Sequence, residues 1–137
     1  MTWDDADLIA DFLVEAEEHL DEADAVLLQL EGNVADAQLR RRLNGCFHTL
    51  KGMASYVDFK EVELLCHVTE SLIAAIAGVS ARTGARHVDL ALQVVTTIRA
   101  YFGAVSDAID ADAGAPSTKA MLEMYARIAN IVRAAAS

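Results

Sequence analysis

Residues that interrupt helices are scarce in this sequence, which holds one proline and seven glycines in 137 positions. Aromatic residues make up only 6%, while alanine and leucine are abundant. Since alanine and leucine favour helix and aromatic residues are enriched in strands, this composition predicts helices and no strands. With 54% apolar residues, a chain of this length can bury one sizeable core but not two, so we expect one domain over residues 1–137.

Lysine and arginine are also few, and residues 1–31 contain neither. Eleven of the 21 acidic residues lie in that same segment, and the net charge is −10. Nucleic-acid binding draws its affinity from clustered lysine and arginine, so this charge argues against a nucleic-acid partner. The acidic segment is expected to form a solvated face.

Cysteine occurs only twice, as Cys46 and Cys66, and both lie within helical apolar patterns. No charged and apolar leader precedes the fold, so we expect neither secretion nor a disulfide framework, and a reducing cytoplasm fits best. The two thiols are expected to be small core residues and not metal ligands. No apolar run approaches the roughly 20 residues that a membrane span requires, so we expect no such span.

Apolar residues instead recur at helical spacing in five segments. The five stripes are Leu8, Phe12, Ala16, Leu20, Ala23, Leu27 and Leu30; Leu39, Leu43, Phe47, Leu50 and Ala54; Val62, Leu65, Leu72 and Ile76; Val88, Ala91, Val95, Ile98, Phe102, Val105 and Ile109; and Leu122, Tyr125, Ile128 and Val132. They predict helices over about 4–31, 35–57, 59–78, 86–110 and 117–135. Short connections make neighbouring helices antiparallel, so we expect an all-α fold, an up-and-down four-helix bundle with a fifth C-terminal helix packed alongside.

Several residues mark the expected helix ends. Asp58 and Glu61 have the spacing of a capping box, which predicts that the third helix starts there. Residues 78–86 contain glycine, serine and threonine and are expected to form a loop. Ser117 is expected to cap the fifth helix. The alanine-rich residues 134–137 could equally end the protein or begin a linker to further domains.

On the second predicted helix, His48 lies about half a turn away from the apolar stripe and is expected to point outward. Gly45 and Gly52 lie on the same face, although a glycine inside a helix costs roughly 1 kcal/mol relative to alanine. These positions predict a bare surface that another protein's active site can approach closely. Lys51 lies one turn after His48, where its ammonium group can neutralise negative charge on a group attached to the imidazole.

On the third predicted helix, Glu63, His67 and Glu70 project from one side because they are four and three residues apart. If the second and third helices pack antiparallel, that side can face His48. A carboxylate that accepts a hydrogen bond from Nδ1–H of an imidazole fixes the neutral tautomer and leaves the Nε2 lone pair free for nucleophilic attack. We expect Glu70 to have this role at His48.

Two short motifs carry a family resemblance. The stretch from Phe47 to Gly52 resembles the H-x-x-K-G signature of histidine phosphotransfer domains, and His67 to Glu70 is similar to the H-x-x-E element of the chemotaxis kinase CheA. The motifs occur in order on adjacent predicted helices. Together with the acidic first helix and the five-helix layout, the likeness covers nearly the whole chain and is strongest to the N-terminal phosphotransfer domain of the CheA family.

The resemblance implies that His48 is phosphorylated, that Glu70 hydrogen-bonds it and that Lys51 and His67 support the transfer. It further implies that His48 accepts the phosphoryl group from ATP on the kinase domain of a CheA-type histidine kinase and passes it to an aspartate of a CheY-like or CheB-like response regulator. Nothing in the sequence resembles a nucleotide site such as a P-loop. We therefore expect no cofactor in this chain, with ATP on the kinase domain and Mg²⁺ on the regulator, and regard the chain as phosphoacceptor and donor.

After the K-G pair, members of the family usually continue with small, glycine-rich residues, whereas this sequence continues with Met53 and bulky neighbours. We expect Met53 and Tyr56 to make a partner-selective apolar contact beside the histidine, because methionine is an adaptable binding side chain. The expected partner-binding residues are Gly45, Gly52, Met53, Ser55 and Tyr56.

Two other classes of function remain open at the level of the sequence. A bundle-core metal protein could use His48, His67, Glu63 and Glu70, but di-iron bundles need Glu-x-x-His on two helices plus two further glutamates, and one reversed pair is present. A purely structural interaction bundle would keep its function when His48 is replaced. His19 and His87 have no companion pattern and are expected at the surface.

Overall fold

The computed structural model describes residues 5–136, and within that range it contains five α-helices, one short 3₁₀ turn and no strands. The helices are α1 (Ala6–Leu30), α2 (Ala37–Tyr56), α3 (Lys60–Ala75), α4 (Ala81–Asp110) and α5 (Lys119–Ala136), and the 3₁₀ turn spans Ile76–Gly78 between α3 and α4. The all-α prediction is confirmed. The expected helix start near residue 4 lies outside the described residues.

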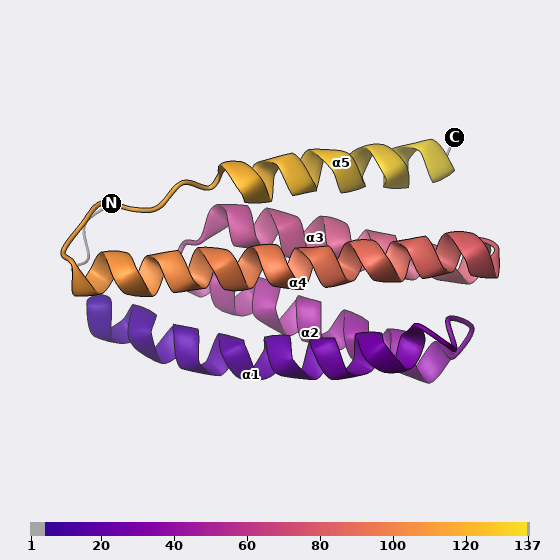
Figure 1. Ribbon diagram of the computed structural model, residues 1–137, viewed down its shortest axis with the longest axis horizontal. Coiled ribbons are helices and arrows are strands. Elements are labelled where there is room, and N and C mark those ends of the chain that lie inside the picture. The colour runs from indigo at the N-terminus through magenta and orange to yellow at the C-terminus, as the bar shows by residue number, and fades with distance from the viewer. Residues whose placement is uncertain (1–4, 137) are drawn as a thin grey trace.

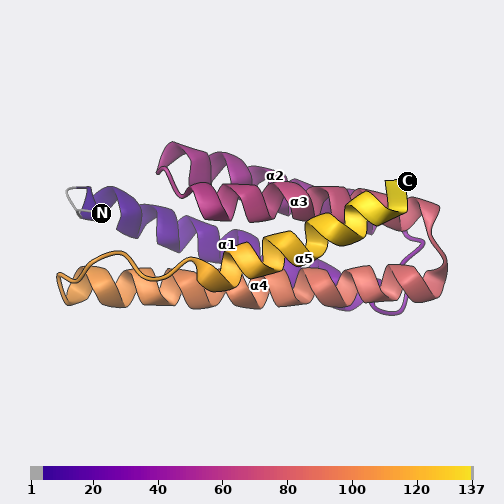
Figure 2. The same ribbon diagram turned by 90° about the horizontal axis from the view of Figure 1, so that it is seen from above.

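Each helix runs antiparallel to the one before it, as Figure 1 shows. Helix α2 packs against α1 and α3, and α4 packs against α1 and α3, so these four helices close an up-and-down bundle. Helix α5 lies along the outside, mainly on α3 and also on α4, and Figure 2 shows it crossing α4 obliquely. The expected architecture, four helices with a fifth alongside, is therefore observed.

One hydrophobic core joins all five helices. It includes the largest fully buried side chains, which are Phe47, Leu20, Leu27, Leu30, Leu43, Leu50, Leu65, Leu72, Ile73, Ile98, Met121 and Ile128. Burial of each such side chain stabilises the folded state by roughly 1.5–3 kcal/mol. The predicted stripes of α2 and α3 all face this core or pack against it.

Two predicted core residues at the ends of stripes are wrong. Leu8 and Leu122 are each 42% exposed, and the adjacent Ile9 and Met121 are buried in their place. Successive side chains of a helix are rotated by about 100°. If a stripe is extended at its end to the residue next to the correct one, that residue points away from the core.

The connection between α2 and α3 differs from the predicted capping box. Asp58 has a left-handed backbone with φ 62°, and α3 has no side-chain cap at its first turn. The amide of Asp58 donates to the Ser55 carbonyl and that of Phe59 to the Ala54 carbonyl. These two bonds form a Schellman motif that ends α2, so Asp58 terminates one helix and does not cap the next. Phe59 then packs edge-on against Phe12 of α1, with ring centroids 5.4 Å apart.

The predicted loop over residues 78–86 is also wrong, because α4 starts at Ala81. The Ser80 hydroxyl accepts a hydrogen bond from the Thr83 amide and caps the helix. Gly84, which suggested a loop, is buried inside α4. A Cβ at this position would lie 3.4 Å from the Ile76 side chain, so glycine lets the helix approach the 3₁₀ turn closely.

Helix α4 is the one described helix whose length and composition would suffice for a membrane span. Half of the apolar window that meets this test is buried inside the bundle. Burial against α1 and α3 accounts for its apolar character, as for a core helix.

Replacing Asp58 with glycine is expected to raise the free energy of unfolding by about 0.5–1 kcal/mol, because glycine adopts a positive φ without a Cβ penalty. Urea denaturation monitored by helical circular dichroism measures the change. Asp58→Ala is the control and should be no more stable than the original chain. A glycine variant less stable than the alanine variant would contradict this account of the turn.

Candidate functional site

His48 lies on the outer face of α2, and its side chain is 71% exposed. Its neighbours Phe47 and Leu50 are buried in the core and fix the face that His48 presents to solvent. The imidazole thus stands on a rigid helix and is open to a visiting molecule, as the sequence predicts.

Glu70 of α3 reaches across to the second helix and lies between two of its side chains. Glu70 Oε2 is 3.4 Å from His48 Nδ1, and Glu70 Oε1 is 2.8 Å from Lys51 Nζ. The glutamate side chain is only 17% exposed and that of Lys51 23%. The structure therefore brings His48, Lys51 and Glu70 together from the two motifs that the sequence analysis selected.

The orientation of this group has a chemical consequence. The carboxylate faces Nδ1 of His48, so it favours the tautomer in which Nδ1 carries the proton. The separation of 3.4 Å is longer than a strong hydrogen bond, which is about 2.9 Å. In this tautomer Nε2 has a lone pair, which is the property that a nitrogen nucleophile needs. The ammonium group of Lys51 holds the carboxylate by a charge-assisted contact and adds positive charge near the ring.

The two predicted glycines flank the histidine on an open surface. Gly45 and Gly52 are exposed, and a Cβ added at either would meet nothing within 4 Å. No internal contact therefore requires glycine at these positions. The bare surface predicted from the sequence is present on both sides of His48.

The other predicted site residues occupy different places. His67 is exposed on α3 and makes no hydrogen bond or ion pair with residues 5–136, so its supporting role stays a prediction. Ser55 is exposed. Tyr56 is 79% exposed, whereas Met53 is half-buried and packs partly against the core.

A groove of about 490 Å³ lies beside this surface, between α1 and α2. Gly52, Met53 and Tyr56 line its α2 side, and Leu8, Asp11 and Glu15 are among the residues on its α1 side. The α1 residues were not predicted from the sequence. Their common helical face, at spacings of three and four, was the available signal, but the groove exists only where α1 and α2 meet.

Neither cysteine supports a metal site. Cys46 and Cys66 are buried free thiols, as expected for core residues. Burial raises the pKa of Cys46 to about 11, and it also raises the pKa of Cys66, with Glu70 adding to the effect. Over residues 5–136, no three His, Cys, Asp or Glu side chains are placed to hold a metal ion together. The bundle-core metal alternative therefore has no geometric support in the described chain.

The prediction for His87 is wrong, because this residue is 4% exposed. Its Nδ1 lies 3.1 Å from the carbonyl oxygen of Leu72. Since a carbonyl only accepts, Nδ1 donates. A buried histidine is tolerated when a hydrogen bond satisfies its ring. The acceptor for His87 lies on the neighbouring helix α3, and the spacing of residues in the sequence cannot identify such a partner.

The chain is similar to a known family of domains and to part of two chemotaxis proteins. A family model described as the Hpt domain matches residues 7–115. The chemotaxis protein CheA of Listeria monocytogenes is 37% identical over 62 residues, which are 45% of this chain and 10% of the relative. CheA of Bacillus subtilis is 35% identical over 65 residues, 47% of this chain and 10% of the relative. The matched segment thus spans about a tenth of these relatives, and no solved structure matches significantly.

Replacing Glu70 with glutamine is expected to lower the fraction of neutral His48 that carries its proton on Nδ1, because the carboxylate that stabilises this tautomer is removed. Nitrogen-15 chemical shifts of the imidazole at high pH report the two tautomers. Glu63→Gln, on the same helix, is the matched control and should leave the ratio unchanged. An unchanged ratio in Glu70→Gln would show that the carboxylate does not orient the ring.

Proposed function

Because a family model covers residues 7–115, the chain belongs to the Hpt domain family, and we propose that His48 is the residue through which it transfers phosphoryl groups. Domains of this family interact with histidine kinases and response regulators. The partial similarity to CheA supports the finer proposal that this chain acts in a CheA-like kinase system of chemotaxis, in the cytoplasm.

The observation that carries the proposal is the approach of Glu70 to Nδ1, and not Nε2, of an exposed histidine. In the first step the Nε2 lone pair forms a bond to the γ-phosphorus of ATP, and the bond from that phosphorus to the bridging oxygen breaks to release ADP. The phosphoimidazole keeps its Nδ1 proton, and Glu70 stabilises the positive charge that develops on the ring. The ammonium group of Lys51 contacts the same carboxylate, and its positive charge stabilises the negative charge of the transferred phosphoryl group.

In the second step a carboxylate oxygen of a regulator aspartate attacks the phosphorus, and the bond to Nε2 breaks and returns the lone pair to the ring. Phosphoryl transfer depends mainly on positioning and electrostatics, so a sparse site suffices on this side. We propose that ATP is held by a CheA-type kinase domain and Mg²⁺ by a CheY-like or CheB-like regulator. His67, exposed one turn before Glu70, is proposed to support the transfer only when a partner is bound.

The α1–α2 groove supports a partner-selective role for Met53 and Tyr56. Tyr56 exposes most of its ring at the groove, and Met53 offers a flexible apolar surface next to Gly52. On the same helix, Met53 lies five residues and Tyr56 eight residues after His48. A regulator that docks on the histidine would therefore also cover them, and the bare surface at Gly45, Gly52 and Ser55 would admit its active site.

Phosphorylation of this chain by a CheA-type kinase domain and ATP is expected to be lost entirely in His48→Gln, because glutamine has no nucleophilic ring nitrogen. Radiolabelled phosphate measured after gel separation tests this, and the label should be acid-labile and base-stable, as for phosphohistidine. His19→Gln, on α1 and outside the proposed site, is the matched control and should remain labelled. Label that persists in His48→Gln would remove the assignment.

Replacing Gly52 with alanine should raise the free energy of unfolding by about 1 kcal/mol and yet slow transfer to a regulator. The gain follows from helix propensity in open space, and the loss follows from the methyl group beside the docking surface. Gly103→Ala is the matched control, since Gly103 is exposed in α4 with equal room for a Cβ. Gly103→Ala should raise the free energy of unfolding by the same amount without slowing the transfer of phosphate to the regulator. Unchanged transfer in Gly52→Ala would refute the clearance role.

A further inference from the structure

A second cavity lies between α4 and α5, the two helices that carry none of the proposed phosphotransfer residues. Its volume is about 430 Å³, within the range of small-ligand pockets. Arg127 and Ile131 on its α5 side lie beyond the residues that the Hpt family model matches. The cavity therefore depends on a part of this chain outside the matched domain.

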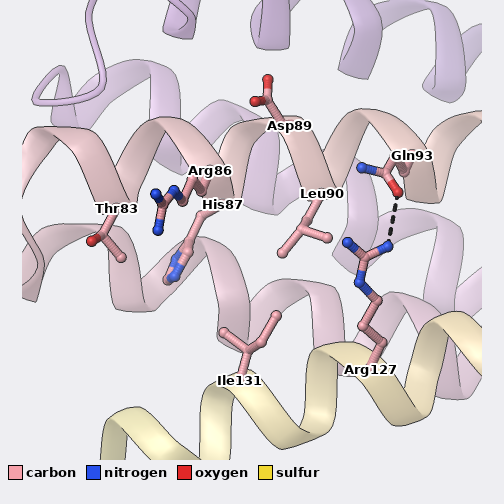
Figure 3. A pocket seen from close by; sticks show the side chains of 8 residues that line it. All are labelled: Thr83, Arg86, His87, Asp89, Leu90, Gln93, Arg127 and Ile131. Carbon is pink, nitrogen blue, oxygen red and sulfur yellow. Dashed lines mark hydrogen bonds between the residues drawn. The ribbon is translucent and has the colours of Figure 1, made fainter.

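Apart from Asp89, which also lines this cavity, the polar side chains lie at its two ends and the apolar ones in its middle. Figure 3 shows Arg86 and His87 toward one end, Arg127 with Gln93 toward the other, and Leu90 and Ile131 between them. Asp89 points away from α5 in the same view. Two guanidinium groups, those of Arg86 and Arg127, thus line this cavity, although the chain as a whole has a net charge of −10.

The two ends differ in how their charged groups are held. Arg127 Nη1 donates to Gln93 Oε1 at 3.2 Å, so the amide fixes the arginine across the gap between the helices. Gln93 uses its acceptor in this bond, and the remaining guanidinium donors of Arg127 stay available. Arg86 is exposed and makes no hydrogen bond or ion pair with residues 5–136.

His87 provides a built polar group at the first end. The ring is 4% exposed and its Nδ1 proton is used by the Leu72 carbonyl. Nε2 therefore is the ring atom left for the cavity, and it has no partner among residues 5–136. Because Nδ1 carries the proton, Nε2 has a lone pair and accepts, so the O–H of a protonated carboxyl group can give the buried ring its second hydrogen bond.

We propose that this cavity binds a linear dicarboxylic acid that carries one proton. The protonated carboxyl group donates its O–H to His87 Nε2 and accepts from Arg86, the apolar chain lies over Leu90 and Ile131, and the ionised carboxylate lies at Arg127. Arginine matches a carboxylate with paired N–H donors. Arg86 and Gln93 are seven residues apart on α4, a rise of about 10 Å at 1.5 Å per residue. The separation suits a chain of intermediate length, such as adipate or suberate, better than succinate.

The test uses the whole chain labelled with nitrogen-15, titrated separately with succinate, adipate, suberate, hexanoate and inorganic phosphate. Adipate or suberate should shift the amides of Thr83, Gln93 and Arg127 and leave that of His48 unmoved. Succinate, hexanoate and phosphate should each bind at least tenfold more weakly, because each loses one charge-assisted contact or the apolar one. Equal binding of hexanoate or phosphate, or no binding of any diacid, would overturn the proposal.

Single substitutions distinguish a specific site from general attraction of anions. Arg86→Gln and Arg127→Gln should each weaken the best diacid about tenfold. Arg133→Gln is the matched control, because Arg133 is exposed on α5 and outside the cavity. Equal weakening by Arg133→Gln would overturn the proposal. Since no phosphotransfer residue is altered, labelling of His48 by kinase and ATP should persist in all three variants.

Discussion

The alignment of α2 against α3 is the constraint on which the candidate site depends. Glu70 lies eight residues after Val62 and five after Leu65, whose burial fixes the rotation of α3. The left-handed turn at Asp58 sets where α3 begins relative to the end of α2. With both fixed, one carboxylate meets Lys51 and the Nδ1 side of His48. A rotation of α3 by a single residue, about 100°, would carry Glu70 away from the histidine and leave a nucleophile without its orienting group.

The sequence was sufficient for those features that local periodicity determines. The buried stripe of α2 predicted that His48 faces outward, and the motif spacing predicted that Glu70 lies on the facing side of α3. Periodicity failed at stripe ends, where one added residue such as Leu8 has no preceding turn to fix its phase. It also failed at turns, where the Asp58 amide donates to the Ser55 carbonyl and the Ser80 hydroxyl accepts from the Thr83 amide. Such bonds depend on the backbone conformation. In these cases a polar residue can either end one helix or begin the next, and the sequence does not distinguish the two roles.

Contacts between distant segments could not be predicted from one sequence. The acidic face of α1 was expected to be merely solvated, yet Arg99 of α4 pairs with Glu17, Asp21 and Asp24. Partial burial opposes the charge of Arg99, but these carboxylates outweigh it and raise its pKa. The cluster ties α1 to α4 on the side away from the α2–α3 pair. The burial of His87 against α3 and the groove at Met53 between α1 and α2 likewise depend on how separate helices pack together.

The two buried thiols make this chain convenient for site-directed labelling. Alkylating reagents attack the thiolate, and burial keeps both Cys46 and Cys66 protonated well above neutral pH. A cysteine introduced on an exposed surface, for example at Thr49, would be the preferred target for a spin label or fluorophore without removal of the native pair. Distances from such a probe to a docked protein could then be measured on a chain whose core is otherwise unaltered.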